Sequence, residues 1–125
     1  MSASEALVQQ QLLIRASELN WRLFRNNVGC AIDARGVPIR YGLCNASKAQ
    51  NQQFKSGDLI GIRPVLITQA HVGTVVGQFV SVEAKREGWR PRDNDQHEQA
   101  QRRWAELVTE LGGFAVMTND VEGLK

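Results

Sequence analysis

The hydrophobic positions at the start of the chain repeat at helical spacing. An apolar side chain recurs every three or four residues, at Val8, Leu12, Ala16, Leu19 and Leu23. Such a stripe is typical of an amphipathic helix, and it predicts one over residues 5–24. Ser2 followed by Glu5 is a candidate capping box at its start.

Shorter apolar segments follow this helix. Residues 28–32 and 37–41 are separated by Asp33-Ala-Arg-Gly36, a sequence typical of a turn, and together they predict a hairpin. Residues 44–57 are polar and show no period, which predicts a loop.

The middle of the chain is rich in Val and Ile. Residues 58–68 and 74–85 predict two antiparallel strands at the centre of a sheet, joined through residues 70–73. Residues 64–82 contain no Asp, Glu, Lys or Arg, but Gln69, His71 and several glycines would be costly in a bilayer, so we do not expect a membrane span.

The C-terminal third predicts a loop, a helix and a strand. Pro91 places residues 88–94 in a loop, after which Asp95 and Glu98 can cap a helix. Gly112-Gly113 ends that helix and residues 114–117 form a last strand. The apolar stripe of the helix consists of Ala100, Trp104, Leu107, Val108 and Leu111. The whole order predicts an α/β fold, one mixed sheet with helices packed on it.

Length and charge set broad limits on function. The 125 residues predict a single domain over 1–125. Fifteen Lys and Arg stand against thirteen Asp and Glu, and the resulting net charge of +2 does not by itself indicate a polyanionic partner. The N-terminus lacks the basic start and apolar stretch of a secretory signal, so we expect a cytoplasmic protein.

Two charged residues interrupt an otherwise apolar strand. Side chains alternate along a strand, so Glu83 and Lys85 share one face and Val82 lies on the other. A simple ion pair is one explanation. Alternatively, Asp58 opens the preceding strand and a hairpin would bring its carboxylate near Glu83, where the two charges repel unless a cation such as Mg²⁺ lies between them.

The combination of Asp58 with Glu83-Ala-Lys85 resembles the PD-(D/E)xK nuclease superfamily. Within it the chain is similar to the virus-type replication-repair nuclease family, VRR-NUC, over nearly its whole length. Two positions depart from the pattern: Ala84 replaces the usual Val, and Gly57 stands where the superfamily name has Pro. The segments that carry the resemblance, in the same order as in the family, are Glu5, Arg25-Asn-Asn-Val-Gly29, Ser56-Gly-Asp-Leu-Ile-Gly61, Glu83-Ala-Lys85, Gln101-Arg-Arg-Trp104, Gly112-Gly113 and Phe114-Ala-Val-Met117.

The resemblance implies a restriction-endonuclease-like fold with a central mixed sheet, and a Mg²⁺- or Mn²⁺-dependent DNA endonuclease. It implies a homodimer that acts on branched or structured DNA, such as Holliday junctions, in phage or mobile-element replication and repair. The alternative is a module of the same fold that binds nucleic acid without cutting it, and a site-specific restriction enzyme is a third possibility.

The resemblance also assigns catalytic roles. Asp58 and Glu83 are the expected metal ligands, and Lys85 is expected to orient the attacking water and offset negative charge. Glu5 is expected near the metal, although it can instead complete the Ser2 cap. Gln101 is expected beside Lys85, with Gln99 as a neighbouring candidate.

Basic residues gather near the end of the Glu83 strand. Lysine and arginine side chains suit phosphate backbones, although on a helix or loop they are often simply solvated. The expected nucleic-acid contacts are Arg25, Arg86, Arg90, Arg92, Arg102 and Arg103.

Overall fold

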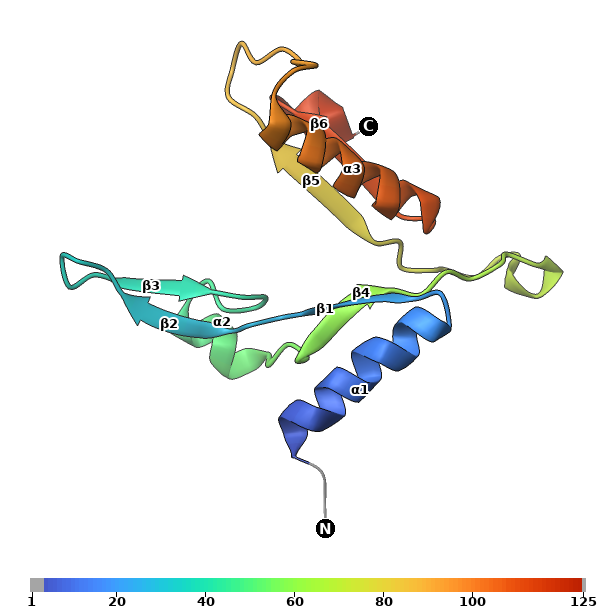
Figure 1. Cartoon of the computed structure of the whole chain (residues 1–125), viewed down its shortest axis with the longest axis horizontal. Helices are drawn as coiled ribbons and strands as arrows, with labels where there is room; N and C mark the ends of the chain where they lie inside the picture. Colours follow the sequence, from blue (N-terminus) through green and yellow to red (C-terminus); the bar gives the residue numbers. More distant parts are fainter. Residues whose placement is uncertain (1–3, 125) are drawn as a thin grey trace. The chain divides into compact units, whose positions relative to one another are not determined.

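The computed structural model describes residues 4–124 and forms two compact units, Met1–Gly61 and Ile62–Lys125, each described here by itself (Figure 1). We call them the N-terminal unit and the C-terminal unit. The described residues form a mixed α/β structure with three α-helices, and their strands pair two by two: β1 with β4, β2 with β3 and β5 with β6. The single domain over 1–125 stays a prediction.

The first helix, α1 (Glu5–Glu18), begins at a different cap from the predicted one. Ser4 is the N-cap, and its Oγ accepts a hydrogen bond from Leu7 N at 3.1 Å. Ser2, the predicted cap, lies outside the described residues. Because the Ser4 side chain accepts a hydrogen bond from a backbone N–H of the first turn, Glu5 is the first residue of the helix.

Helix α1 also ends earlier than predicted, so the expected helix over residues 5–24 is wrong in its last turns. Asn20 adopts a left-handed backbone with φ 63°, and Trp21 N donates to Ala16 O at 2.8 Å. This is a Schellman ending, with asparagine at the left-handed position that glycine usually occupies. The chain then continues as β1 (Arg22–Arg25).

The predicted hairpin is confirmed. Strands β2 (Gly29–Ile32) and β3 (Pro38–Tyr41) are antiparallel, with Ala31 opposite Ile39. Asp33 closes the turn, because its carboxylate accepts hydrogen bonds from two backbone N–H groups at 2.8 Å and its own N–H binds the carbonyl of Val37.

The predicted loop over residues 44–57 contains a short helix, α2 (Lys48–Gln53), so this prediction was wrong. Ser47 caps it by accepting from Gln50 N at 3.0 Å, and Gln50 Oε1 accepts from Ala46 N at 2.7 Å. These reciprocal caps form a polar helix without any apolar stripe, which is why periodicity did not reveal it.

Strand β4 (Leu59–Ile62) pairs with β1 rather than with the strand that carries Glu83. Gly61 is required at this pairing, since a Cβ there would lie 1.8 Å from the carbonyl oxygen of Arg22. The predicted antiparallel hairpin of residues 58–68 and 74–85 is therefore wrong.

The segment between β4 and Val80 is mostly extended and carries a 3₁₀ turn, η1 (Gln69–His71), where the hairpin turn was predicted. Pro64 lies two residues after the end of β4 and lacks the N–H that a continuing ladder needs. Leu66 and Val75 are 83% and 99% exposed, so the apolar character of this segment does not reflect a buried strand. No helix within residues 4–124 has the length and apolarity to cross a membrane.

From residue 86 on, the C-terminal unit contains the predicted loop, helix and last strand. Strand β5 (Val80–Ala84) runs parallel to β6 (Phe114–Thr118), with Glu83 opposite Met117. Helix α3 (Gln96–Glu110) connects them and packs along the pair (Figure 1). A 3₁₀ turn, η2 (Val121–Leu124), follows β6.

Both predicted ends of α3 are confirmed. Asp95 Oδ1 accepts from Glu98 N at 3.1 Å, which caps the start of the helix. At the other end Gly112 has φ 92°, and Gly113 N donates to Val108 O at 2.9 Å in a second Schellman ending.

Val108 is the centre of the packing between α3 and the strands. Its side chain is 0% exposed, so we expect Val108→Ala to lower the free energy of unfolding by about 2 kcal/mol. Val121→Ala is the matched control, because Val121 is 79% exposed and its truncation is expected to cost less than about 0.5 kcal/mol. Urea denaturation of the full chain measures both, and equal effects would contradict the packing described.

Candidate functional site

The face of β5 that carries Glu83 and Lys85 is turned toward α3. Ser81 Oγ accepts from Trp104 Nε1 at 2.8 Å, and Lys85 Nζ donates to Gln101 Oε1. On the opposite face Val82 is 46% exposed. The predicted alternation along this strand is therefore confirmed, and the polar face is the one that the helix covers.

Glu83 lines a cavity of about 240 Å³ between the strands and α3. Gln101, Trp104 and His97 approach it from the helix, and the remaining walls are mostly apolar. In the described part of the chain no ion pair joins Glu83 to Lys85, so the simple ion pair considered from the sequence is not formed. A half-buried carboxylate in an apolar hollow interacts more strongly with a nearby cation than one in bulk water.

Gln101 connects Lys85 to a residue that the sequence did not single out. Gln101 Nε2 lies 3.3 Å from His97 Nε2, one helical turn earlier. Because Gln101 Oε1 accepts from Lys85, its Nε2 is the donor, and the hydrogen-bond network assigns His97 Nε2 as the acceptor. The i, i+4 spacing was the sequence signal for this contact. Gln99, the alternative to Gln101, binds the loop instead.

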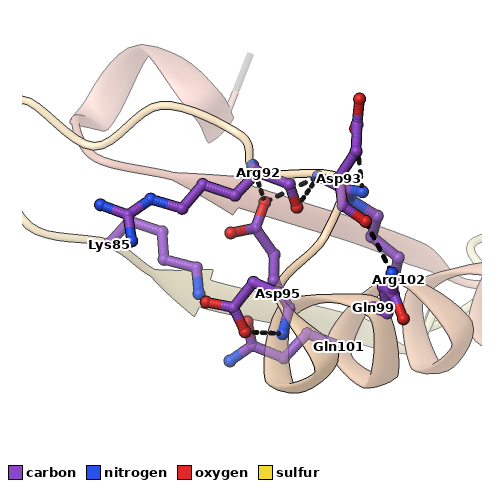
Figure 2. Close-up of polar contacts among 8 residues, drawn as sticks. Lys85, Arg92, Asp93, Asp95, Gln99, Gln101 and Arg102 are labelled. Atoms are coloured by element: carbon purple, nitrogen blue, oxygen red, sulfur yellow. Dashed lines mark hydrogen bonds and ion pairs between the residues drawn. The ribbon is translucent and has the colours of Figure 1, made fainter.

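Three side chains of α3 fasten the loop over residues 86–95, and we call them the loop clamp: Glu98, Gln99 and Arg102. The Glu98 side chain is buried, and its Oε1 accepts from Arg92 N at 2.8 Å and from Arg102 Nη2 at 2.7 Å. Gln99 Nε2 donates to Asp93 O at 2.6 Å, and Arg102 Nη2 to Arg92 O at 3.2 Å. Figure 2 shows these contacts at the start of the helix.

The clamp makes the stability of the C-terminal unit depend on pH. The N–H of Arg92, assisted by Trp89 and Arg102, lowers the pKa of Glu98 below its ordinary 4.5, and the N–H of Glu98 lowers that of Asp95 below 3.8. Both carboxylates therefore stabilise the folded unit. This stabilisation is complete above their ordinary pKa, and it is lost as the pH falls through the lower pKa that each has in the folded protein.

We accordingly expect the melting temperature to fall as pH decreases from about 6 to about 3. Glu98→Gln should flatten this dependence, since it removes one of the two titrating groups. Thermal melts followed by circular dichroism at each pH measure the slope, and a slope unchanged by Glu98→Gln would contradict the assignment.

The predicted basic residues are not equivalent. Arg102 is held in the loop clamp and also lies 3.4 Å from Asp93, so its position is structural. Arg86, Arg90 and Arg92 are exposed on the clamped loop, and Arg103 is exposed on α3. The remaining candidate, Arg25, is exposed at the end of β1 in the N-terminal unit.

Asp58 lies in a polar hollow of the N-terminal unit, of about 520 Å³. It directly precedes β4, and its carbonyl accepts from Asn26 N at 2.8 Å. Asn26 Nδ2 in turn holds the preceding segment by donating to Gly57 O at 2.9 Å. Asn27 and Tyr41 line the same hollow.

The residue of α1 that lines this hollow is Gln9, one turn after Glu5. Glu5 itself is exposed in the first turn of the helix. Sequence reasoning missed Gln9, although its i, i+4 spacing from Glu5 places both on one face of α1. Glu18, the weaker alternative to Glu5, is paired with Arg15 at 2.9 Å.

The donor atoms around Glu83 and Asp58 suit a hard divalent cation. Within residues 4–124 there is no group of three or more His, Cys, Asp or Glu side chains that could hold a metal ion. Each carboxylate instead has a carboxamide beside it, Gln101 in one unit and Gln9 in the other, and the Oε1 of Gln101 already accepts from Lys85. The oxygen donors that remain are carboxylates and the amide of Gln9, and they fit Mg²⁺, which takes one or two carboxylates and completes its shell with waters and substrate phosphates.

Comparisons of the chain with protein-family models, with curated proteins and with solved structures found no match.

Proposed function

We propose that the protein is a Mg²⁺- or Mn²⁺-dependent endodeoxyribonuclease with the PD-(D/E)xK fold, related to the VRR-NUC family. The observation that supports this most is the arrangement on one face of β5, where Glu83 and Lys85 lie beside each other and Gln101 of α3 binds Lys85. The three residue types in this order are those that the resemblance assigned to catalysis.

The role of Lys85 follows from its surroundings. Its ammonium group is held by the amide of Gln101, and the ring of Trp89 lies 5.7 Å from Nζ. These contacts restrict a flexible side chain, which keeps a positive charge ready for the negative charge that develops on a phosphate during hydrolysis. His97 is a positioning residue in this scheme, since it fixes the orientation of the Gln101 amide.

Glu83 and Asp58 are each proposed as a metal ligand. A divalent ion bound by such a carboxylate would act as a Lewis acid that polarises the scissile phosphate. Glu83 supplies a carboxylate next to Lys85 in the C-terminal unit. Asp58 is proposed from the resemblance, and its polar hollow with Gln9 and Asn27 supplies the oxygen donors that such an ion prefers. Glu5 remains a proposed outer residue near the metal, as the resemblance implies.

The resemblance also supports a substrate and a setting. We propose branched or structured DNA as the substrate and a homodimer as the active form, since two symmetric sites can cut two strands. The setting is phage or mobile-element replication and repair, in the cytoplasm of a bacterial or phage-infected host cell. The exposed arginines Arg86, Arg90 and Arg92 provide positive charge for the backbone.

The experiment that tests this function is a cleavage assay with labelled linear, single-stranded and four-way DNA, each with Mg²⁺, Mn²⁺ or EDTA. We expect cutting that requires the ion and is strongest on the four-way substrate. Binding that persists equally in EDTA, with no cleavage of any substrate, would favour the non-cleaving nucleic-acid-binding module.

A further inference from the structure

A second cavity in the C-terminal unit is lined mainly by cations. It measures about 190 Å³ and lies between the end of β5, the loop over residues 86–95 and the start of α3. Since a water molecule occupies roughly 30 Å³, the space is large enough for a tetrahedral anion. Its lining consists of Lys85, Arg86, Trp89, Arg90, Arg92, Asp95, His97 and Glu98.

The charges around this cavity are unbalanced. The two carboxylates that line it are already engaged by the protein: Asp95 caps α3, and Glu98 binds Arg92 N and Arg102. None of the four cations forms an ion pair within residues 4–124, although Lys85 donates to Gln101, Arg86 donates to the carbonyl of Glu87, and the charge of Arg92 helps to lower the pKa of Asp95. An anion entering the cavity would therefore meet several cationic groups that no carboxylate contacts directly.

The cavity is held in shape before any ligand binds. The loop clamp fixes the backbone of residues 92 and 93, and Trp89 N donates to Arg86 O at 3.1 Å. Trp89 Nε1 is buried, and the Trp89 side chain contributes to the lowered pKa of Glu98, which places the indole beside the clamp. A fixed loop loses little entropy on binding.

The position of the cavity connects it to the proposed active site. His97 lines both this cavity and the one that contains Glu83, so the two adjoin at the start of α3. Lys85 lines the cationic cavity while its Nζ binds Gln101. Figure 2 shows the Arg92 side chain extending away from the clamp on the Lys85 side.

We propose that this cavity is a phosphate-binding pocket, preorganised by the loop clamp, that takes a backbone phosphate of the nucleic acid. The choice of nucleic acid as the source of the phosphate rests on the proposed function. The pocket would hold a phosphate next to the one that is cut and so fix the register of the strand. Arg90 and Arg92 are the residues proposed to bind it, because they line the pocket and take no part in the proposed chemistry.

The test is an NMR titration of the isotope-labelled full chain in EDTA. The probes are inorganic phosphate and a short oligothymidylate without a terminal phosphate, and the signals are the indole N–H of Trp89 and the amides of residues 86–95. We expect saturable shifts with both probes. Arg90→Gln and Arg92→Gln should each weaken oligothymidylate binding about tenfold, the loss of one charge-assisted hydrogen bond.

Arg22→Gln is the matched control, because it removes the same charge from an exposed position of β1 that lies outside the pocket and is not one of the expected nucleic-acid contacts. We expect it to change the affinity less than about twofold, as for a surface charge that makes no direct contact. A loss equal to that of Arg90→Gln would show general attraction to a basic surface and overturn the pocket. Shifts with phosphate but none with oligothymidylate would overturn the nucleic-acid source.

Glu98→Gln tests the preorganisation. Removing a negative charge from the lining should strengthen anion binding if electrostatics alone decided, whereas a loosened loop should weaken it. We expect weaker binding with the fold retained, judged by the dispersion of the amide signals, and unchanged or stronger binding would overturn the role of the clamp. Because EDTA prevents cleavage, these results stand apart from the nuclease assay: phosphate binding can succeed where cutting fails, and the reverse.

Discussion

Replacing Lys85 with methionine is expected to reduce the rate of DNA cleavage by about 10³-fold, with little change in the metal concentration that the reaction requires. Methionine keeps the length and apolar body of the side chain but removes the charge that Gln101 orients. The effect should therefore fall on the chemical step, and single-turnover cleavage of a labelled four-way DNA measures it.

Lys48→Met is the control for this variant, since Lys48 is an exposed lysine in α2. It should cleave at the rate of the unaltered protein. Full metal-dependent cleavage by Lys85→Met would remove the proposed role of the lysine. A loss caused by unfolding is recognised by a changed circular dichroism melt.

Glu83→Gln is expected to have a comparable effect for a different reason. The glutamine has the same shape as Glu83 and fills the same place in the 240 Å³ cavity, but it lacks the carboxylate charge. Losing a ligand of the ion should weaken metal binding and cost several kcal/mol of transition-state stabilisation, about 10³-fold in rate. Cleavage measured across a series of Mg²⁺ concentrations should show a higher metal requirement as well as a lower maximal rate.

The metal requirement separates the two variants. The Mg²⁺ concentration required for cleavage should rise for Glu83→Gln and stay unchanged for Lys85→Met. Glu106→Gln, an exposed carboxylate on α3, is the control and should leave the curve unaltered. Unchanged cleavage by Glu83→Gln at low Mg²⁺ would contradict its assignment as a ligand.

The elements that the sequence predicted well are those whose ends are decided locally. Asp95 and Gly112 fixed the two ends of α3, because a cap and a left-handed glycine act within one helical turn. The turn at Asp33 fixed the β2–β3 hairpin in the same way. No information from distant residues was needed for either.

Elements that depend on long-range pairing were predicted poorly. Val and Ile between residues 64 and 76 suggested strands. However, β-propensity says only that a side chain packs well in a sheet, and it does not say which strand will be its neighbour. Strand β4 pairs with β1 and β5 with β6, both distant in sequence. The early end of α1 at Asn20 was missed because asparagine is an uncommon choice for that position.

In the candidate site, too, local features were predicted well and long-range contacts were not. Alternation along β5 was enough to place Glu83 and Lys85 on one face, and the resemblance favoured Gln101, whose amide binds Lys85. His97 and Gln9 were missed because their positions depend on how a helix packs against a strand or a loop. Short-range patterns therefore identify candidate residues, and tertiary packing identifies their neighbours.

Metal binding at Glu83 is the central claim, and paramagnetic broadening by Mn²⁺ tests it most directly. In NMR spectra of the labelled full chain, a small amount of Mn²⁺ should broaden the backbone amide signals around Glu83, and excess Mg²⁺ should restore them. Glu83→Gln should abolish this broadening. Signals around Glu83 that stay sharp in the presence of Mn²⁺ would contradict the claim.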